Sequence, residues 1–243
     1  MTSRQASYDL FAWVYNRHWG GHAEWMLGAI RELALRDLPP PGRVLDLCCG
    51  TGQLDRALQA LGYEVVGVDE SPAMIRFARE NAPACDFIVS DVREFLAPGA
   101  FDLALCMYDS LNHLMATEEL RRAFRAIRRA LRGGASFLFD LNMEEGFRER
   151  WHGSFGIVED DHVCVVRSRF LAQDAAGEFL ATIFRNESGW TRSDVLLRQR
   201  CYAADDVTRA LSSEGFSNIR VIDALKDLGL RGQAGRSFFL CAA

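Results

Sequence analysis

The apolar and polar pattern of the chain begins with a helical stretch. Residues 4–38 have helical spacing, and the proline-rich stretch 39–42 ends it sharply. The aromatic residues near one face of this stretch are Tyr8, Phe11, Tyr15 and Trp19. We therefore expect residues 1–40 to form an N-terminal helical cap.

From residue 43 onward, short apolar runs alternate with helical patterns. The expected strands are 43–48, 64–69, 85–90, 101–107 and 135–141, and the expected helices are 53–61, one from Pro72, and 118–131. Capping signals agree with these limits: Ser71 before Pro72, Thr117 before two glutamates, and Gly133-Gly134 as a stop. The alternation predicts an α/β fold, with a parallel sheet covered by helices on both faces.

The pattern changes near residue 151. Three β-rich runs separated by polar turns follow without a helix, which predicts an antiparallel insertion over 151–201. A helix at 204–214, closed by Gly215, and two last strands at 218–225 and 236–242 then resume the earlier pattern. We expect residues 1–150 and 202–243 to form one domain that carries this insertion.

The composition is that of an ordinary globular protein. Of the 243 residues 49% are hydrophobic and 25% are charged, and no run approaches the ~20 apolar residues of a membrane span. The N-terminus lacks the pattern of a secretory signal, so we expect a cytoplasmic protein without a membrane partner. Seven cysteines without CxxC spacing predict reduced core residues, neither a disulfide framework nor a zinc site.

A net charge of -5 argues against a general nucleic-acid binder. One basic segment, residues 121–132, still has to be explained. Its apolar positions share one helical face and its arginines lie on the other, which favours a solvated helix surface. An RNA or protein contact is the alternative.

The sequence VLDLCCGTGQLD, residues 44–55, is an apolar run followed by a glycine turn. A dinucleotide site needs a third small residue where this chain has Asp55, and no Walker-type GK[ST] follows. Asp46 would repel a pyrophosphate and suits a cationic ligand. Asp69, 19 positions after Gly50, can accept hydrogen bonds from ribose hydroxyls, and Asp91 can accept one from an exocyclic amine such as adenine N6.

A cation, a ribose and an adenine together describe S-adenosylmethionine. At this point the chain resembles the class I S-adenosylmethionine-dependent methyltransferases, through VLDLCCGTG, GVDESPAMI, SDVREF and FDLALCMYDSLNHL in that order. The resemblance implies a Rossmann-like seven-stranded sheet, S-adenosylmethionine as cofactor and S-adenosylhomocysteine as product. The implied cofactor-binding residues are Tyr15, Asp46, Cys48, Gly50, Gly52, Asp69, Glu70, Met74, Asp91, Val92 and Cys106. Cys48 is a departure, because the family more often has glycine there.

Methyl transfer from a sulfonium needs no metal, and the protein mainly aligns the nucleophile and removes a proton where necessary. Candidates lie in MYDSLNHL, just after the fourth strand. We expect His113 to act as a base, and Tyr108, Asp109 or Asn112 to orient the acceptor or hold the amino-acid end of the cofactor. A helix-start histidine bonded only to backbone is the alternative for His113.

The insertion resembles the β lid of small-molecule methyltransferases such as glycine and amino-sugar N-methyltransferases. This implies methyl transfer to nitrogen or oxygen of a small-molecule acceptor, with the insertion forming the acceptor pocket. Its arginines could bind a carboxylate or phosphate there; they are Arg167, Arg169, Arg185, Arg198 and Arg200. An RNA-directed methyltransferase and a non-catalytic cofactor-binding protein are the competing functions. We expect a monomer, or a homodimer paired through the edge of the inserted sheet.

Overall fold

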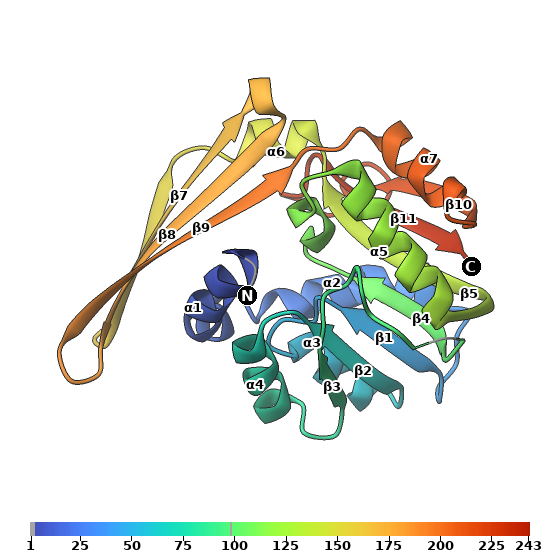
Figure 1. The fold of residues 1–243 in the computed structure, drawn as a ribbon, viewed down its shortest axis with the longest axis horizontal. Helices are drawn as coiled ribbons and strands as arrows, with labels where there is room; N and C mark the ends of the chain where they lie inside the picture. The colour runs from blue at the N-terminus through green and yellow to red at the C-terminus, as the bar shows by residue number, and fades with distance from the viewer. Residues whose placement is uncertain (1–2, 98) are drawn as a thin grey trace.

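A seven-stranded sheet forms the centre of the molecule (Figure 1). The computed structural model describes residues 3–97 and 99–243. The strands are β1 (Arg43–Leu47), β2 (Glu64–Asp69), β3 (Asp86–Val89), β4 (Phe101–Cys106), β5 (Leu131–Asn142), β10 (Ser217–Asp223) and β11 (Arg236–Ala242), in the order β10-β11-β5-β4-β1-β2-β3. The chain reverses its direction of travel across the sheet between β1 and β4, which creates a ligand-binding crevice at the carboxyl ends of these strands.

The sheet is parallel from β1 to β5, as the sequence predicts, but its last two strands differ. β11 runs antiparallel to both β5 and β10. No helix lies between β10 and β11, and a parallel return would need a crossover connection of the kind that the earlier strands have. The sheet is therefore mixed, and the expectation of a parallel sheet holds for its first five strands only.

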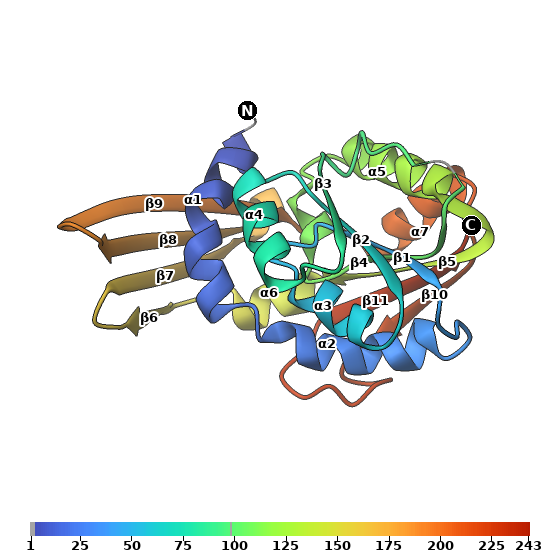
Figure 2. The same ribbon diagram turned by 90° about the horizontal axis from the view of Figure 1, so that it is seen from below.

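Helices cover both faces of the sheet, as expected (Figure 2). The helices are α1 (Ser3–His18), α2 (His22–Ile30), α3 (Gln53–Ala60), α4 (Pro72–Asn81), α5 (Thr117–Ala130), α6 (Glu144–Arg150) and α7 (Ala204–Ser213), with a π-helical turn η1 (Arg31–Leu35) after α2 and short 3-10 turns η2 (Ser110–His113) and η3 (Ala172–Asp174). One buried cluster joins α5 and α7 to the sheet through Phe137 and Phe139, and another joins α2 and α3 through Leu105 and Leu138. Alternate side chains of each strand thus enter opposite cores.

The insertion is a separate four-stranded antiparallel sheet. Its strands are β6 (Ser154–Val158), β7 (His162–Leu171), β8 (Ala176–Asn186) and β9 (Trp190–Arg200), in sequential order. In Figure 1 it projects away from the central sheet, with α1 beneath it. Phe11 and Val14 of α1 are buried against Cys164 and Leu197 of this sheet. Helix α1 also contacts α4, so it connects the two sheets.

Some local expectations are wrong. Thr117 is the first residue of α5 and not its cap, which is Ala116. Gly133 and Gly134 do not stop this helix, because it already ends at Ala130 and both glycines lie within β5. The sequence pattern also missed α6 and the interruption of the N-terminal helical stretch at residues 19–21.

Candidate active site

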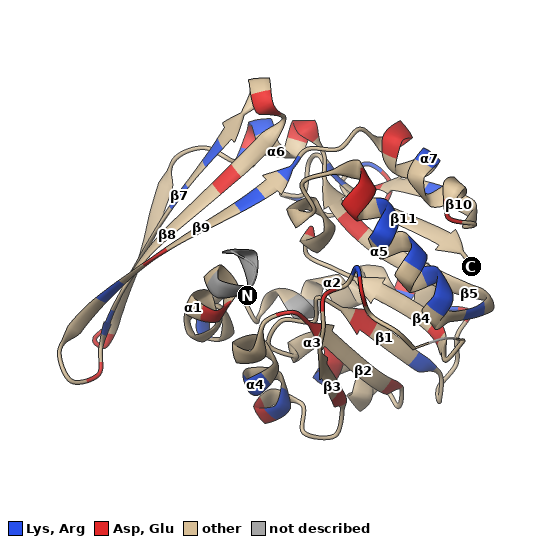
Figure 3. Cartoon of the chain, in the orientation of Figure 1, with Lys and Arg blue, Asp and Glu red and all other residues tan. Residues whose placement is uncertain are grey.

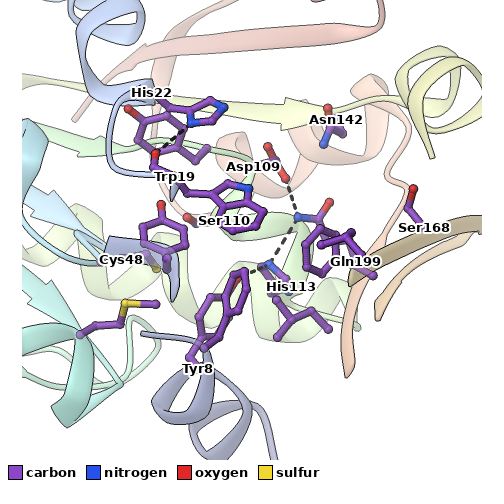
Figure 4. A pocket seen from close by; sticks show the side chains of 18 of the residues that line it. Tyr8, Trp19, His22, Cys48, Asp109, Ser110, His113, Asn142, Ser168 and Gln199 are labelled. Carbon is purple, nitrogen blue, oxygen red and sulfur yellow. Dashed lines mark hydrogen bonds between the residues drawn. The ribbon is translucent and has the colours of Figure 1, made fainter. Parts of the chain in front are cut away.

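A cavity of about 390 Å³ lies at the carboxyl ends of the central strands, between α1 and the inserted sheet. It brings together three expected catalytic residues and seven expected cofactor-binding residues. The cavity lining includes His113, Tyr108, Asp109, Tyr15, Cys48, Gly50, Asp69, Glu70, Met74 and Val92. Figure 4 shows residues from α1, the central sheet and the inserted sheet around this space.

The glycine turn after β1 depends on left-handed backbone at three positions. Cys48, Gly50 and Gly52 have φ angles of 56°, 57° and 80°. A Cβ atom at position 50 would lie 3.4 Å from the ring of Tyr15, inside the cavity wall. Gly52 has another role, because a Cβ there would lie 2.9 Å from the Ala78 backbone of α4. Gly52 therefore permits close packing of the turn against α4.

Asp69 ends β2 with its carboxylate held in the cavity wall. Its Oδ2 accepts a hydrogen bond of 3.1 Å from the Gly50 backbone N–H, and its Oδ1 accepts one of 2.9 Å from the Ser71 N–H. The glycine turn and the start of α4 thus fix its orientation. A carboxylate has room for further donors, such as hydroxyl groups of a ligand.

Asp46 is not in the main cavity wall, contrary to the expectation for a residue that binds the cofactor's cation directly. It is 2% exposed and lines a smaller chamber of about 10 Å³ with Tyr15, Cys48 and Tyr108. Its side chain meets Asp55, and burial together with Asp55 raises its pKa well above the ordinary range. Burial raises the pKa of Asp55 to about 7. Two carboxylates can only accept, so a hydrogen bond between the Asp46 and Asp55 side chains requires a proton on one of them.

Asp91 and Cys106 also differ from expectation. Both Asp91 oxygens accept hydrogen bonds from Arg93, the closest at 2.5 Å, and the neighbouring Val92 lines the cavity instead. Cys106 is fully buried in the core beside Cys48. Arg93 therefore engages Asp91, and Cys48 lies beside Cys106. The sequence pattern reveals neither contact.

His113 and Tyr8 both line the cavity and are in direct contact (Figure 4). Its Nδ1 lies 2.8 Å from the Arg198 carbonyl oxygen of β9, and its Nε2 lies 2.8 Å from the Tyr8 hydroxyl. A carbonyl only accepts, so Nδ1 carries the proton in the neutral ring and Nε2 is the basic nitrogen. His113 thus has a side-chain partner in addition to its backbone contact.

Tyr108 and Asp109 adopt left-handed backbone conformations, with φ of 65° and 50°, directly after β4 and Met107. Their backbone N–H groups donate to the buried Asp140 carboxylate at 2.7 and 3.0 Å. Burial raises the pKa of Asp140 to about 6, although Arg236 opposes this shift. Non-glycine residues in this conformation are strained and are common at functional sites.

Asp109 belongs to a polar network that the sequence did not reveal. Its Oδ1 lies 2.8 Å from Arg236 Nη2, and its other oxygen accepts from the Gln199 amide. Burial alone would lower the pKa of Arg236, but Asp140 and Asp109 outweigh burial and raise it. The Gln199 amide nitrogen is also 3.3 Å from His113 Nε2. The network therefore connects β9 and β11 to the expected catalytic residues.

The five arginines proposed from the insertion do not supply this chemistry. Arg169 and Arg198 pair with Glu178, Arg185 pairs with Glu187, and Arg200 donates to the Met115 carbonyl. The fifth, Arg167, is exposed and does not line the cavity. Among the described residues, the arginines that line the cavity are Arg150 and Arg236. The sequence analysis missed both because it considered only the arginines of the inserted strands. Arg150 lies on α6, a helix that was not predicted, and Arg236 begins β11.

The basic segment 121–132 lies along α5, where Figure 3 shows a row of Lys and Arg positions. Acidic groups pair with several of these arginines. Arg121 and Arg125 both pair with Glu214, and Arg122 pairs with Glu94. These ion pairs are consistent with a solvated helix face.

Residues 3–97 and 99–243 contain no group of three or more His, Cys, Asp or Glu side chains arranged to hold a metal ion. In the same part of the chain, no helix is long and apolar enough to cross a membrane.

The polar and aromatic side chains that line the cavity suit S-adenosylmethionine. Glycine at 50 leaves open the space beside Tyr15, and Asp69 and Glu70 line the cavity with carboxylates, which can accept hydrogen bonds from hydroxyl groups such as those of a ribose. The Tyr108 hydroxyl is buried and has no hydrogen-bond partner among the described residues, so it can serve a ligand. The aromatic wall suits a sulfonium.

Comparisons with known proteins agree with this geometry. Residues 44–134 match the family described as "Methyltransferase domain". The chain is 28% identical over 208 residues to "Putative methyltransferase YqeM" of Bacillus subtilis, which covers 83% of this chain and 84% of that protein.

Two solved structures have the same fold along nearly the whole chain. An S-adenosylmethionine-dependent methyltransferase from Clostridium acetobutylicum has a TM-score of 0.76 and 22% identity, over 97% of this chain and 98% of that one. The sugar N-methyltransferase KedS8 from Streptoalloteichus has a TM-score of 0.76 and 24% identity, over 97% and 92%. With the family match and the motif residues at the cavity, these findings identify the chain as a class I S-adenosylmethionine-dependent methyltransferase.

Proposed function

We propose that this enzyme transfers a methyl group to a nitrogen or oxygen atom of a small-molecule acceptor. The observation that carries the proposal is the Tyr8–His113 pair inside the cavity, with a basic nitrogen 2.8 Å from a hydroxyl. Protonated amines and hydroxyl groups must lose a proton on methylation, and such a pair can receive it. The similarity to a sugar N-methyltransferase supports a small acceptor.

When bound, S-adenosylmethionine supplies an electrophilic methyl group for in-line displacement. The chain's own residues position the reactants. Asp69 and Glu70 bind the ribose hydroxyls, and the Tyr15 ring covers the glycine turn. His113 Nε2 takes the acceptor's proton directly or through the Tyr8 hydroxyl, while the Arg198 carbonyl holds the proton on Nδ1. Tyr108 and Asp109 line the same space and orient the two reactants.

We also assign residues 151–201 as the acceptor lid and the remainder as the cofactor domain. Val166, Ser168, Phe179, Leu197 and Gln199 of the inserted sheet line the cavity. Together with α1 they would exclude water from the reacting groups. A lid placed in this way favours an acceptor enclosed in the cavity over a large RNA held at the surface.

The first test is calorimetry of the purified protein with S-adenosylmethionine and S-adenosylhomocysteine, with NAD as the negative control. Micromolar binding of the first two compounds alone is the expected result. A panel of small amines and phenols with labelled methyl donor then tests transfer, beside bulk tRNA. Transfer to tRNA alone would overturn the small-molecule acceptor, and cofactor binding without any transfer would support a non-catalytic protein.

A further inference from the structure

One guanidinium group in the cavity wall, that of Arg150, forms no ion pair with a carboxylate of the described residues. Arg150 is the last residue of α6 and is partly buried. It donates to the Ala234 carbonyl, and its Nη2 lies 2.7 Å from the Asn142 Oδ1 acceptor. Both acceptors are uncharged, and no carboxylate within residues 3–97 and 99–243 forms an ion pair with Arg150. A guanidinium has five N–H donors, so several are left for a ligand.

Arg236, the other arginine among the described residues that line the cavity, does form ion pairs. Arg236 is paired with Asp109 at 2.8 Å and with Asp140. These two carboxylates are therefore paired with Arg236, whereas Arg150 feels Asp109, Glu145 and Glu149 only as nearby charges and forms no ion pair among the described residues. Burial and the nearby Arg236 charge lower the pKa of Arg150, but a guanidinium remains protonated in proteins. Such a charge is costly unless an anion approaches it.

The glycine at position 146 leaves room for the side chain of Arg150. A Cβ atom on Gly146, one helical turn earlier, would lie 2.7 Å from Arg150 Nη2 and 2.7 Å from the Gly235 carbonyl oxygen. Glycine at 146 thus lets the guanidinium fold back toward Asn142. Arg148 of the same helix is different, because it is exposed and pairs with Glu144.

Flat aromatic surfaces lie close to these guanidinium groups. Trp25 and Trp151 line the same cavity, and the Arg236 guanidinium carbon is 5.9 Å from the centre of the Trp25 ring. Trp151 packs over Gly177 of β8, where a Cβ would lie 2.5 Å from its ring. Aromatic walls of this kind favour a planar ligand body.

We propose that Arg150 is an anion-binding residue of the acceptor subsite, and that the acceptor is a planar ring compound carrying a carboxylate or phosphate group. The proposal rests on the proposed function, because it describes the second substrate of that reaction. Arginine binds both anions through paired N–H donors, and Asn142 fixes the orientation of the fork. The reacting atom of the acceptor would lie toward His113, which lines the same cavity.

The test uses three simple probes with the enzyme saturated in S-adenosylhomocysteine. Benzoate, phenyl phosphate and benzamide are titrated while tryptophan fluorescence is recorded, because several tryptophans line the cavity. We expect benzoate or phenyl phosphate to bind about tenfold or more tightly than the uncharged benzamide. The tighter of the two anions identifies which source of negative charge the site prefers.

Variants then assign the preference to one residue. Arg150→Gln should reduce it below about twofold, whereas Arg148→Gln, on the same helix, should keep it. Arg150→Lys retains the charge and should keep a weakened preference, which preserves the test if Arg150→Gln melts abnormally. Equal binding of all three probes, or an anion preference that survives Arg150→Gln, would overturn the proposal.

S-adenosylhomocysteine affinity separates the two proposals. Wild-type enzyme that fails to bind it contradicts the proposed function, whereas wild-type enzyme that binds it but shows no anion preference contradicts the Arg150 site alone. If Arg150→Gln weakens S-adenosylhomocysteine binding about tenfold, Arg150 serves the cofactor and the acceptor subsite is refuted.

Discussion

His18 of α1 and His162 of β7 are joined by a 2.7 Å hydrogen bond between their Nε2 atoms, 144 positions apart in the chain. His162 Nδ1 also lies 2.6 Å from Asp161 Oδ1, and Arg17 pairs with the same carboxylate. The carboxylate fixes a proton on His162 Nδ1, so the neutral pair shares a single proton between the two Nε2 atoms. The N-terminal helix is thereby connected to the inserted sheet.

This pair predicts that acid loosens α1. Burial and the neighbouring His162 lower the pKa of His18, so the unfolded chain binds a proton that the folded pair resists. Stability from this contact is present above the ordinary histidine pKa of 6.5 and is lost as the pH falls below it. Amide exchange over residues 3–18 should be about threefold or more faster at pH 5.5 than at pH 7.5, after correction for intrinsic rates.

The matched variants are His18→Gln, which should remove most of this pH dependence, and His152→Gln at an exposed histidine, which should not. Equal corrected exchange at the two pH values in the wild type would contradict the prediction.

The buried Asp46–Asp55 pair predicts that stability falls as the pH rises. Burial raises the pKa of Asp55 from an ordinary 3.8 to about 7, so the folded state holds a proton that the unfolded state has lost. Stability from this proton is complete below the unfolded pKa and is lost as the pH rises through about 7. Asp55→Asn should raise the free energy of unfolding at pH 8 by about 1–3 kcal/mol.

Urea unfolding at pH 5.5 and pH 8 measures this effect, with exposed Asp86→Asn as the control. The Asp55 variant should have a smaller difference between the two pH values than the wild type. A variant less stable than wild type at pH 8 would show that the carboxylate is needed in its charged form.

Asp69→Ala should weaken S-adenosylmethionine binding by one to two orders of magnitude. The carboxylate is held in the cavity wall by two backbone N–H groups, and hydrogen bonds to a charged group contribute roughly 1.5–3 kcal/mol each. Calorimetry measures the affinity, with exposed Glu80→Ala on α4 as the control. Unchanged affinity in a folded Asp69 variant would remove this residue from the cofactor site.

His113→Ala should lower kcat by about a hundredfold or more with a proton-losing acceptor, because positioned general bases contribute roughly 10²–10⁴-fold. Tyr8→Phe should have a smaller effect, since it leaves His113 Nε2 available. The control is S-adenosylhomocysteine affinity, which both variants should retain. If His113→Ala keeps full kcat, the histidine is not the base.

The sequence by itself determined the fold class, the order of the motifs and several of the residues that line the cavity. Apolar residues at every second position mark the buried face of a strand, and apolar residues at helical spacing mark the buried face of a helix. Each pattern lies within one short segment of the sequence. The glycine turn at Gly50 and the acid that ends β2 are local as well, because each follows directly from where a strand stops. Such features can be read without knowing which distant segments meet.

Only the tertiary structure decided which side chains become partners. Asp55 meets Asp46 because α3 packs on β2, the neighbour of β1, and Arg236 reaches Asp109 because β11 enters the sheet beside β5. Arg150 and His113 line one cavity although they come from α6 and η2. These contacts depend on strand order and on the folding of α1 and the inserted sheet over the central sheet. The spacing of residues within one segment does not encode these contacts. Hydrophobic patterning determines which face of a helix or strand is buried, but not which polar side chains of other elements lie beside it.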